Sequence, residues 1–435
     1  MQRRQFLESL ALSAVALPLA RAYAEDKDAV ASSLPQALGL PDPKPYKFKP
    51  SIAKLPAWTL GDASQHDKWT LMFRGNLSHT FYGSGTVPAE PKLLWKFEMA
   101  EYATLKHGEP TVWKGSGWTG QSLRYGDYVW IGSTGGHMHC FEAMTGKLVW
   151  VFAAQRMIKG SPCLWSNRLY FVCVDNYLRC LDAATGKLLW QWRSPNDVDS
   201  SPCVYQGRLY VGGEDGAVKC FDPLTGKLHW KKDFGVGCCE KPGSGGIESS
   251  IAIASGRAYF GHLDGHVRAI DPADGKLLWA TKIGGDTDAS PVVVGDRLWI
   301  GTEEPNDAGE SFFCLSATDG RKLWARKLGG IWSSAAVVDG KLYVGTHGGK
   351  MLCLDPATGD TIWSYEIGIS TWNSPSVVDG KVLFGAYDRY YRILDAATGK
   401  LLWKFDVGDR CHSAAAIADG RIWVGSASGS YYCFG

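Results

Sequence analysis

One nine-residue motif recurs along the chain and limits what the chain can fold into. Its clearest copy is Asp182-Ala-Ala-Thr-Gly-Lys-Leu-Leu-Trp190. Some further copies share its Asp, Gly and Trp, and looser copies share only the closing Trp. The closing tryptophans of all the copies are Trp95, Trp150, Trp190, Trp230, Trp279, Trp324, Trp363 and Trp403. Most of these are roughly forty residues apart, and a fixed period of this size indicates a propeller, a solenoid or an array.

Each repeat divides into four short β-rich segments. In the repeat 199–230 they are residues 200–205, 208–212, 217–221 and 227–230, with Gly-, Asp- and Pro-containing turns between them. The segments have no helical period. One four-stranded sheet cannot bury both of its faces, but such sheets packed radially can. The repeats therefore predict an all-β propeller of four-stranded antiparallel blades.

The two ends of the repeat region predict how the ring closes. The last repeat has three strands, within 414–434, and lacks a fourth. Residues 92–97 are a fourth strand with no blade before it. Joined, they complete one blade that contains both Trp95 and Tyr432. We therefore expect eight blades, with the last blade closed by the N-terminal strand, so that no sheet edge stays open.

Residues 1–24 have the features of an export signal. Arg3-Arg4-Gln5-Phe6-Leu7 precedes an apolar run from Leu10 to Ala20, and Ala22-Tyr23-Ala24 has the small-x-small pattern that signal peptidase cleaves. The paired arginines resemble a twin-arginine (Tat) signal. An ordinary secretory signal is the alternative. We expect cleavage after Ala24, a periplasmic location and no membrane anchor.

The rest of the chain is predicted to be a proline-rich extended tail at residues 25–67 and a propeller at residues 68–435. Six prolines between residues 35 and 56 favour extended chain in the tail. The formal net charge is +2 and no basic cluster occurs. This charge argues against nucleic acid or an anionic membrane as a partner. A small molecule or an envelope protein is the expected partner.

A second motif leads into the first repeat. It reads Trp69-x-x-x-Phe73-Arg74-Gly75-Asn76-x-x-His79-Thr80. Together with the repeats it resembles the PQQ-like, or quinoprotein-like, propeller family over residues 68–435. That family includes PQQ-dependent alcohol dehydrogenases and the outer-membrane assembly lipoprotein, which binds proteins and no cofactor. The resemblance implies the fold and leaves the activity open.

One loop position varies sharply between repeats and is expected to line the central funnel, where propellers bind ligands. It lies two residues before a serine that recurs at the start of the innermost strand. Around the ring this position reads Lys159, Asp199, Glu248, Asp288, Trp332, Trp372 and His412. Three carboxylates on consecutive blades, beside a lysine and facing two tryptophans and a histidine, predict a ligand site. The alternative is that these loops simply carry polar residues where solvent reaches them.

The carboxylates suit a hard cation such as Ca²⁺. In the quinoprotein dehydrogenases a metal polarises the PQQ quinone, a Trp stacks on the PQQ plane and an Asp acts as base. The resemblance implies Glu248 or Asp199 as metal ligands, Asp288 as the base, and Trp332 or Trp372 as the stacking residue. It would place Lys159 and His412 against the same cofactor, which would be PQQ with Ca²⁺ or a lanthanide.

The cysteines fall into two groups. Cys238 and Cys239 lie in an unusually long entry loop. Quinoprotein alcohol dehydrogenases carry adjacent cysteines in a similar loop, as a strained disulfide ring over PQQ, and the resemblance implies the same contact here. Two unrelated thiols are the alternative. The other ten cysteines are expected to fill packing positions.

Three functions remain open. The first is an exported module that binds a ligand, metal or partner at the funnel. The second is a PQQ-dependent oxidoreductase of the alcohol dehydrogenase type, which Cys238 and Cys239, the carboxylates and the tryptophans favour. The third is a protein-interaction scaffold of the cell envelope. The compact blades favour the first, because catalytic members of the family usually carry large insertions.

Overall fold

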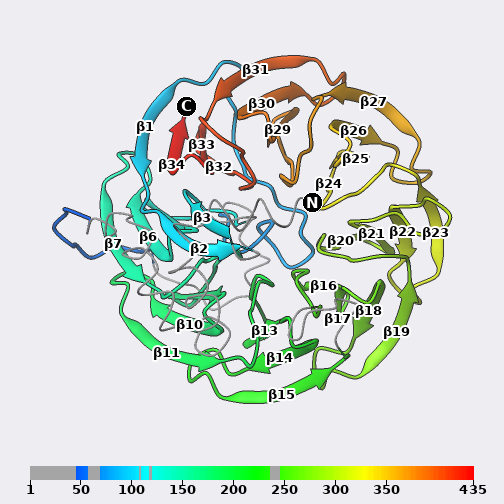
Figure 1. Ribbon diagram of the computed structural model, residues 1–435, viewed down its shortest axis with the longest axis horizontal. Helices are drawn as coiled ribbons and strands as arrows, with labels where there is room; N and C mark the ends of the chain where they lie inside the picture. The colour runs from blue at the N-terminus through cyan, green and yellow to red at the C-terminus, as the bar shows by residue number, and fades with distance from the viewer. Residues whose placement is uncertain (1–45, 57–68, 107–108, 117–119, 236–244) are drawn as a thin grey trace, which may run out of the picture.

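The computed structural model is a ring of eight four-stranded antiparallel sheets around a central axis (Figure 1). It describes residues 46–56, 69–106, 109–116, 120–235 and 245–435. These residues form strands, turns and loops and no helix. None of them forms a helix suited to crossing a membrane. The predicted all-β, eight-bladed propeller is confirmed.

The blades follow one another in chain order, and each runs from its innermost to its outermost strand. Blades one to four comprise β4 Leu123–Tyr125, β5 Tyr128–Gly132, β6 His137–Glu142, β7 Leu148–Ala153; β8 Cys163–Trp165, β9 Arg168–Cys173, β10 Tyr177–Asp182, β11 Leu188–Arg193; β12 Cys203–Tyr205, β13 Arg208–Val211, β14 Ala217–Phe221, β15 Leu228–Asp233; β16 Ala252–Ala254, β17 Arg257–His262, β18 His266–Ile270 and β19 Leu277–Lys282. Blades five to eight comprise β20 Val292–Val294, β21 Arg297–Gly301, β22 Phe312–Ser316, β23 Lys322–Arg326; β24 Ala336–Val338, β25 Lys341–Gly345, β26 Lys350–Leu354, β27 Thr361–Glu366; β28 Ser376–Val378, β29 Lys381–Gly385, β30 Tyr390–Asp395, β31 Leu401–Asp406; β32 Ala416–Ala418, β33 Arg421–Gly425, β34 Ser430–Phe434 and β1 Leu93–Glu98.

Blade eight closes the ring in the predicted way. Its outermost strand is β1, which pairs antiparallel with β34. The register sets Trp95 opposite Cys433 and Lys96 opposite Tyr432. The two ends of the propeller are thus joined by backbone hydrogen bonds within one sheet.

The innermost strands are shorter than the sequence predicts. In blade three, β12 begins at Cys203 rather than at residue 200. The two preceding serines bond elsewhere: the Ser201 N–H donates to Ser250 Oγ of the next blade (3.1 Å), and Ser200 Oγ accepts from the Gly212 N–H (3.3 Å). One of these bonds links the segment to the next blade and the other holds it beside the end of β13 in its own blade.

The repeated motif joins six of the eight blades to the next by an indole hydrogen bond, and Trp230 Nε1 of blade three has no such partner among the described residues. In blade two, Trp190 Nε1 donates to the Pro223 carbonyl of blade three (3.0 Å). The indole also lies against Gly226, where an added Cβ would come within 2.7 Å of the Trp190 ring. The same indole-to-carbonyl bond joins Trp95 to Ala143, Trp150 to Ala183, Trp279 to Ala317, Trp324 to Pro356 and Trp363 to Ala396. The period in the sequence is therefore the period of the blade contacts.

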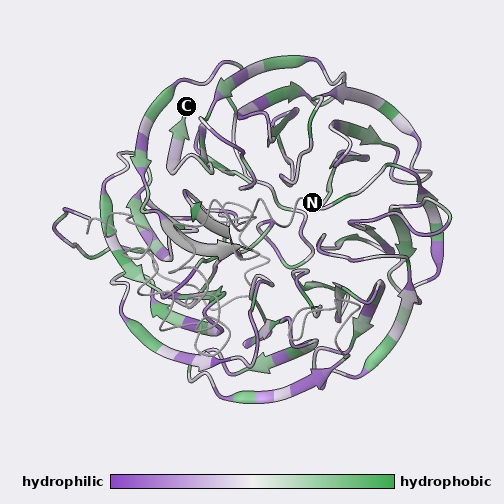
Figure 2. Cartoon of the chain, in the orientation of Figure 1, coloured by the Kyte–Doolittle hydropathy of each residue, from purple (hydrophilic) through white to green (hydrophobic). Residues whose placement is uncertain are grey.

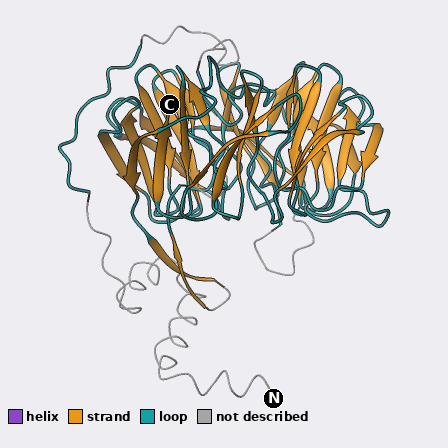
Figure 3. Ribbon diagram, turned by 90° about the horizontal axis from the view of Figure 1, so that it is seen from above, coloured by secondary structure: helices purple, strands orange, loops and turns teal. Residues whose placement is uncertain are grey.

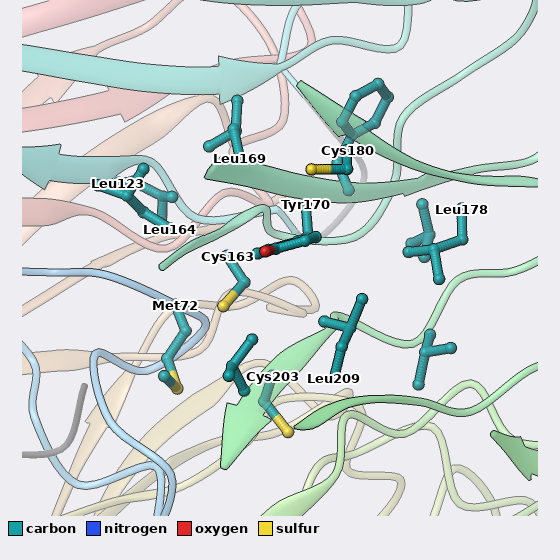
Figure 4. Packing of buried hydrophobic residues seen from close by; sticks show 14 of the residues in the cluster. Met72, Leu123, Cys163, Leu164, Leu169, Tyr170, Leu178, Cys180, Cys203 and Leu209 are labelled. Atoms are coloured by element: carbon teal, nitrogen blue, oxygen red, sulfur yellow. The ribbon is translucent and has the colours of Figure 1, made fainter. Parts of the chain in front are cut away.

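Residues 69–85, called the plug below, occupy the centre of the ring. The plug exchanges backbone hydrogen bonds with the innermost strands of several blades, among them Leu164 N–H to the Leu71 carbonyl (2.7 Å) and Ile253 N–H to the Leu77 carbonyl (2.7 Å). Met72 belongs to the same buried cluster as Cys163 and the other core residues drawn in Figure 4.

Arg74 anchors the plug from a fully buried position. Its guanidinium donates to the Ala335 carbonyl of blade six (2.6 Å) and to the Pro375 carbonyl of blade seven (2.7 Å). It also lies over the ring of Tyr82, 4.3 Å from the centroid, in a cation–π contact. The motif at residues 69–80, on which the family resemblance partly rests, therefore lies in the plug that fills the centre of the ring.

Two further segments leave the plane of the blades. Residues 46–56, called the strap below, run outside β7 as the dark-blue segment of Figure 1. Strands β2 Tyr102–Lys106 and β3 Glu109–Trp113 form a hairpin, which the sequence did not predict. Figure 3 shows this hairpin protruding from one face of the ring.

The ten cysteines within the described residues are buried, and none of them forms a disulfide with another of the ten. Cys163, Cys180 and Cys203 lie among leucines and Tyr170 in the core (Figure 4). Burial raises the pKa of the Cys180 thiol to about 12. Their predicted packing role is confirmed.

Gly226→Ala tests the blade contact. Gly226 has a φ of 71°, so any alanine there costs about 1–2 kcal/mol of backbone strain. The clash with Trp190 should add about 1–3 kcal/mol. Gly207→Ala is the matched control, because Gly207 has a φ of 69° and nothing within 4 Å of the added Cβ. We expect Gly226→Ala to lower Tm clearly more than Gly207→Ala, and equal shifts would contradict the contact.

Candidate functional site

Most of the predicted site residues line one cavity at the mouth of the funnel. Its volume is about 80 Å³ and Phe73 of the plug contributes to its wall. The predicted residues in its lining are Lys159, Asp199, Glu248, Asp288, Trp332 and Trp372. His412 lines a neighbouring cavity. Cys238 and Cys239 lie outside the described residues.

A ring of serine hydrogen bonds holds these loops in register. The N–H of each serine donates to the hydroxyl of the serine in the next blade: Ser161 to Ser201 (3.0 Å), Ser201 to Ser250 (3.1 Å), Ser250 to Ser290 (2.9 Å), Ser290 to Ser334 (3.0 Å) and Ser334 to Ser374 (3.0 Å). Because each serine is fixed, the residue two places before it lines the funnel cavity in blades two to seven.

Blades two to five form an acidic half of the funnel. Asp199, Glu214 and Glu248 each bring one carboxylate oxygen within 4.8 Å of the other two. Lys159 Nζ donates to Asp199 Oδ2 at 2.5 Å. The second oxygen of Asp199 is buried and has no hydrogen-bond partner among the described residues. The cluster therefore holds more negative charge than Lys159 neutralises.

This excess charge shows in the pKa values of the carboxyls. Burial, reinforced by Asp199 and Glu248, raises the pKa of Glu214 to about 9. The charge of Asp288, and then burial, raises the pKa of Glu248 well above its usual range. Burial and Glu303 raise the pKa of Asp288 to about 7. Such shifts mean that placing another positive charge in the cavity would be favourable.

The same carboxylates also shift the pKa of Lys159. Burial alone would lower the pKa of its ammonium, but the charges of Asp199 and Glu248 outweigh burial, and the net pKa is raised. Lys159 is therefore a fixed cation, not a proton donor near neutral pH.

Blades six to eight form an aromatic half of the funnel. The Trp332 and Trp372 ring centroids are 3.7 Å apart, with an angle of 61° between the planes. Trp372 also stacks with His412 at 5.3 Å. His347 and Tyr387 extend this cluster, 5.0 Å from Trp332 and 4.9 Å from Trp372. The two tryptophans contact each other, and no flat slot separates them.

His412 belongs to a second cavity, of about 90 Å³, at the base of the β2–β3 hairpin. Arg410 and Lys114 line it with His412. Cys411 points away from both cavities, and its thiol donates to the Gly425 carbonyl (3.3 Å). It therefore packs in the core and is no ligand at the funnel.

The sequence analysis missed Glu214 and Glu303. Both lie two residues after the glycine at the end of the second strand, Gly212 in blade three and Gly301 in blade five. The same position holds His347 in blade six, which joins the aromatic half. Aligning the repeats on this glycine, as well as on the inner serine, would have identified these residues.

The match to a family covers nearly the whole propeller. A family model described as outer membrane protein assembly factor BamB matches residues 86–232, 167–330, 214–369 and 308–434. The chain belongs to this family. The comparison with curated proteins found no match.

Solved structures share the fold at low identity. A europium-containing methanol dehydrogenase superposes with a TM-score of 0.70 at 14% identity, over 86% of this chain and 99% of that one. Quinohemoprotein alcohol dehydrogenase from Comamonas testosteroni gives 0.69 at 15% identity, over 85% and 81%. BamB from Moraxella catarrhalis gives 0.64 at 16%, over 79% and 99%. At these identities the likeness shows the fold alone.

The described residues of this cavity fit a metal ion, and the cavity between them is small for PQQ. Sites for small organic molecules usually enclose about 300–1,000 Å³, whereas this cavity has about 80 Å³. In contrast, clustered carboxylates with one oxygen lacking a partner are the donor set that Ca²⁺ and similar hard cations prefer.

Glu214→Gln tests the electrostatics in cation-free protein. Glu214 has a folded pKa of about 9 against an ordinary value of 4.5. Its contribution to stability is therefore lost as pH rises between these values, and a glutamine loses nothing. We expect Glu214→Gln to raise Tm, and by more at pH 9 than at pH 6. A gain that does not depend on pH would contradict the raised pKa. Comparing the two proteins at each pH cancels the titration of the cysteines.

Proposed function

We propose that this protein is an exported propeller of the cell envelope that binds one hard multivalent cation, Ca²⁺ or a lanthanide, at the acidic half of its funnel. The observation that carries the proposal is the Asp199–Glu214–Glu248 cluster, whose ligand oxygens lie within 4.8 Å of one another. Export rests on the signal-like residues 1–24, and the envelope location is in keeping with the family description.

Each carboxylate has a distinct part in this proposal. Asp199 and Glu248 reach the cation from two entry loops, and Glu214 reaches it from the turn after β13. Asp288 is close enough to be the largest influence on Glu248, and it orients water bound to the cation. The cavity of about 80 Å³ leaves room for the cation and few waters, because each water occupies about 30 Å³.

Lys159 sets the affinity and the selectivity. Its ammonium bonds to Asp199 Oδ2, so an incoming cation must compete for this oxygen or share it. A monovalent ion gains too little from the remaining carboxylates to do so, whereas a divalent or trivalent ion gains more. The lysine therefore prevents Na⁺ and K⁺ from binding to the carboxylates, whereas divalent and trivalent cations can still bind.

Terbium luminescence tests the proposal directly. Trp332 and Trp372 line the same cavity as the carboxylates and can transfer excitation energy to Tb³⁺ bound there. We expect sensitised emission that Ca²⁺ competes away. Glu248→Gln should weaken binding at least tenfold, about 1.4 kcal/mol. Lys159→Met should strengthen it, because it frees Asp199.

Glu366→Gln is the control, since this glutamate is exposed on β27 with 67% of its side chain accessible. Absence of emission, or equal affinities of the Glu248 and Glu366 variants, would refute the cation site. The opposite signs expected for Glu248→Gln and Lys159→Met separate a site effect from a general loss of folding.

A further inference from the structure

We propose that the outer strands of blades two to four, β11, β15 and β19, form a docking surface for an extended acidic segment of a partner protein. This surface lies on the rim of the ring and is independent of the funnel. The strap shows how an extended segment sits on an outer strand of this propeller.

The strap covers residues that are exposed in other blades. On β7, Leu148 is 7% exposed and Val149 is 1% exposed. The equivalent residues of β11, Leu188 and Leu189, are 36% and 41% exposed. Tyr46 and Phe48 pack with Leu148, and Ala53 packs in the cluster that contains Val149. Outer strands of this propeller can therefore bury their leucines under an extended chain.

The backbone takes part in the same contact. The Ser51 N–H donates to the Val149 carbonyl (2.9 Å). Val149 is the extra residue of a bulge, because Trp150 pairs with Cys140 and Leu148 with Phe141. Leu189 and Leu278 are the extra residues of equivalent bulges in blades two and four. A bulge leaves its extra residue unpaired in the sheet, so each provides a similar carbonyl at the rim.

The exposed leucines of blade two begin beside the strap. The Ala53 N–H donates to the Ala184 carbonyl of blade two (2.9 Å), at the edge of this surface. From there the leucine belt continues through Leu188, Leu189, Leu224, Leu228, Leu277 and Leu278, which are 36–50% exposed. Figure 2 shows hydrophobic stretches on β11 and β19. Adjacent apolar groups of this kind mark interaction surfaces more often than scattered ones do.

The charges on and beside β11, β15 and β19 indicate which kind of segment binds to this surface. Within β11, β15 and β19 the basic residues are Arg193, Lys231, Lys232 and Lys282. The turns before these strands add Lys187, Lys227 and Lys276 and also Asp182, Asp222, Asp271 and Asp274. Asp233 is the one acidic residue within β11, β15 and β19. The strap itself is basic, with Lys47, Lys49 and Lys54, and it lies on β7, which has no charged residue. A second copy of the strap would meet like charges on the belt, whereas an acidic segment with alternating apolar residues complements it.

Two peptides of the strap length test the proposal by fluorescence anisotropy with the full-length protein. One has the sequence of residues 45–56, and the other has its three lysines replaced by glutamate. We expect the acidic peptide to bind at least tenfold more tightly than the basic one at low salt. The double variant Leu277→Ser/Leu278→Ser should weaken binding at least fivefold. Ile362→Ser is the control, because Ile362 is 50% exposed on β27 of blade six, away from the belt.

Equal binding of the two peptides, or no binding of either, overturns the proposal. So does a belt variant that binds as the Ile362 variant does. Self-association that the belt variant abolishes would assign the surface to a second copy of this chain, and would also overturn it. All of these substitutions are at exposed residues. Each variant is tested for folding by measuring its Tb³⁺ binding and its Tm, which should equal those of the unmodified protein.

Discussion

Six blades of this propeller hold the next through one tryptophan, whose indole donates to a turn carbonyl and lies against a turn glycine. The rest of the structure depends on this contact, because a single four-stranded sheet cannot bury both of its faces. Once the blades are fixed, the serine hydrogen bonds hold the entry loops of blades two to seven in register. The funnel is therefore assembled from residues far apart in sequence without any long-range motif of its own.

The plug fills the centre of the ring, so that only a small cavity remains at the mouth of the funnel. Arg74 ties it to the carbonyls of blades six and seven, and Phe73 lies at the floor of the cavity. Several carboxylates then share a small volume with one ammonium, that of Lys159. Burial and repulsion between the carboxylates outweigh this ammonium and raise the carboxyl pKa values. Repulsion of this kind costs stability in the free protein. Proteins commonly accept such a cost where a ligand will relieve it.

The sequence was sufficient for the fold because the contact that builds the ring is periodic. The motif spacing predicted eight blades, and the lone strand at residues 92–97 predicted closure through β1. The entry-loop residues also came from the period, since Asp199, Glu248 and Asp288 occupy one repeat position. Glu214 was missed because it lies in a different turn. The plug, the strap and the β2–β3 hairpin were missed because they occur once, and no repeat reveals what they contact.

The most direct test of the cation site is anomalous diffraction from crystals grown with Tb³⁺, measured at the terbium absorption edge. The account predicts one strong peak in the funnel, coordinated by carboxylate oxygens of Asp199, Glu214 and Glu248, and its loss in Glu248→Gln crystals. A funnel without a peak, while terbium occupies only exposed carboxylates elsewhere, would contradict it.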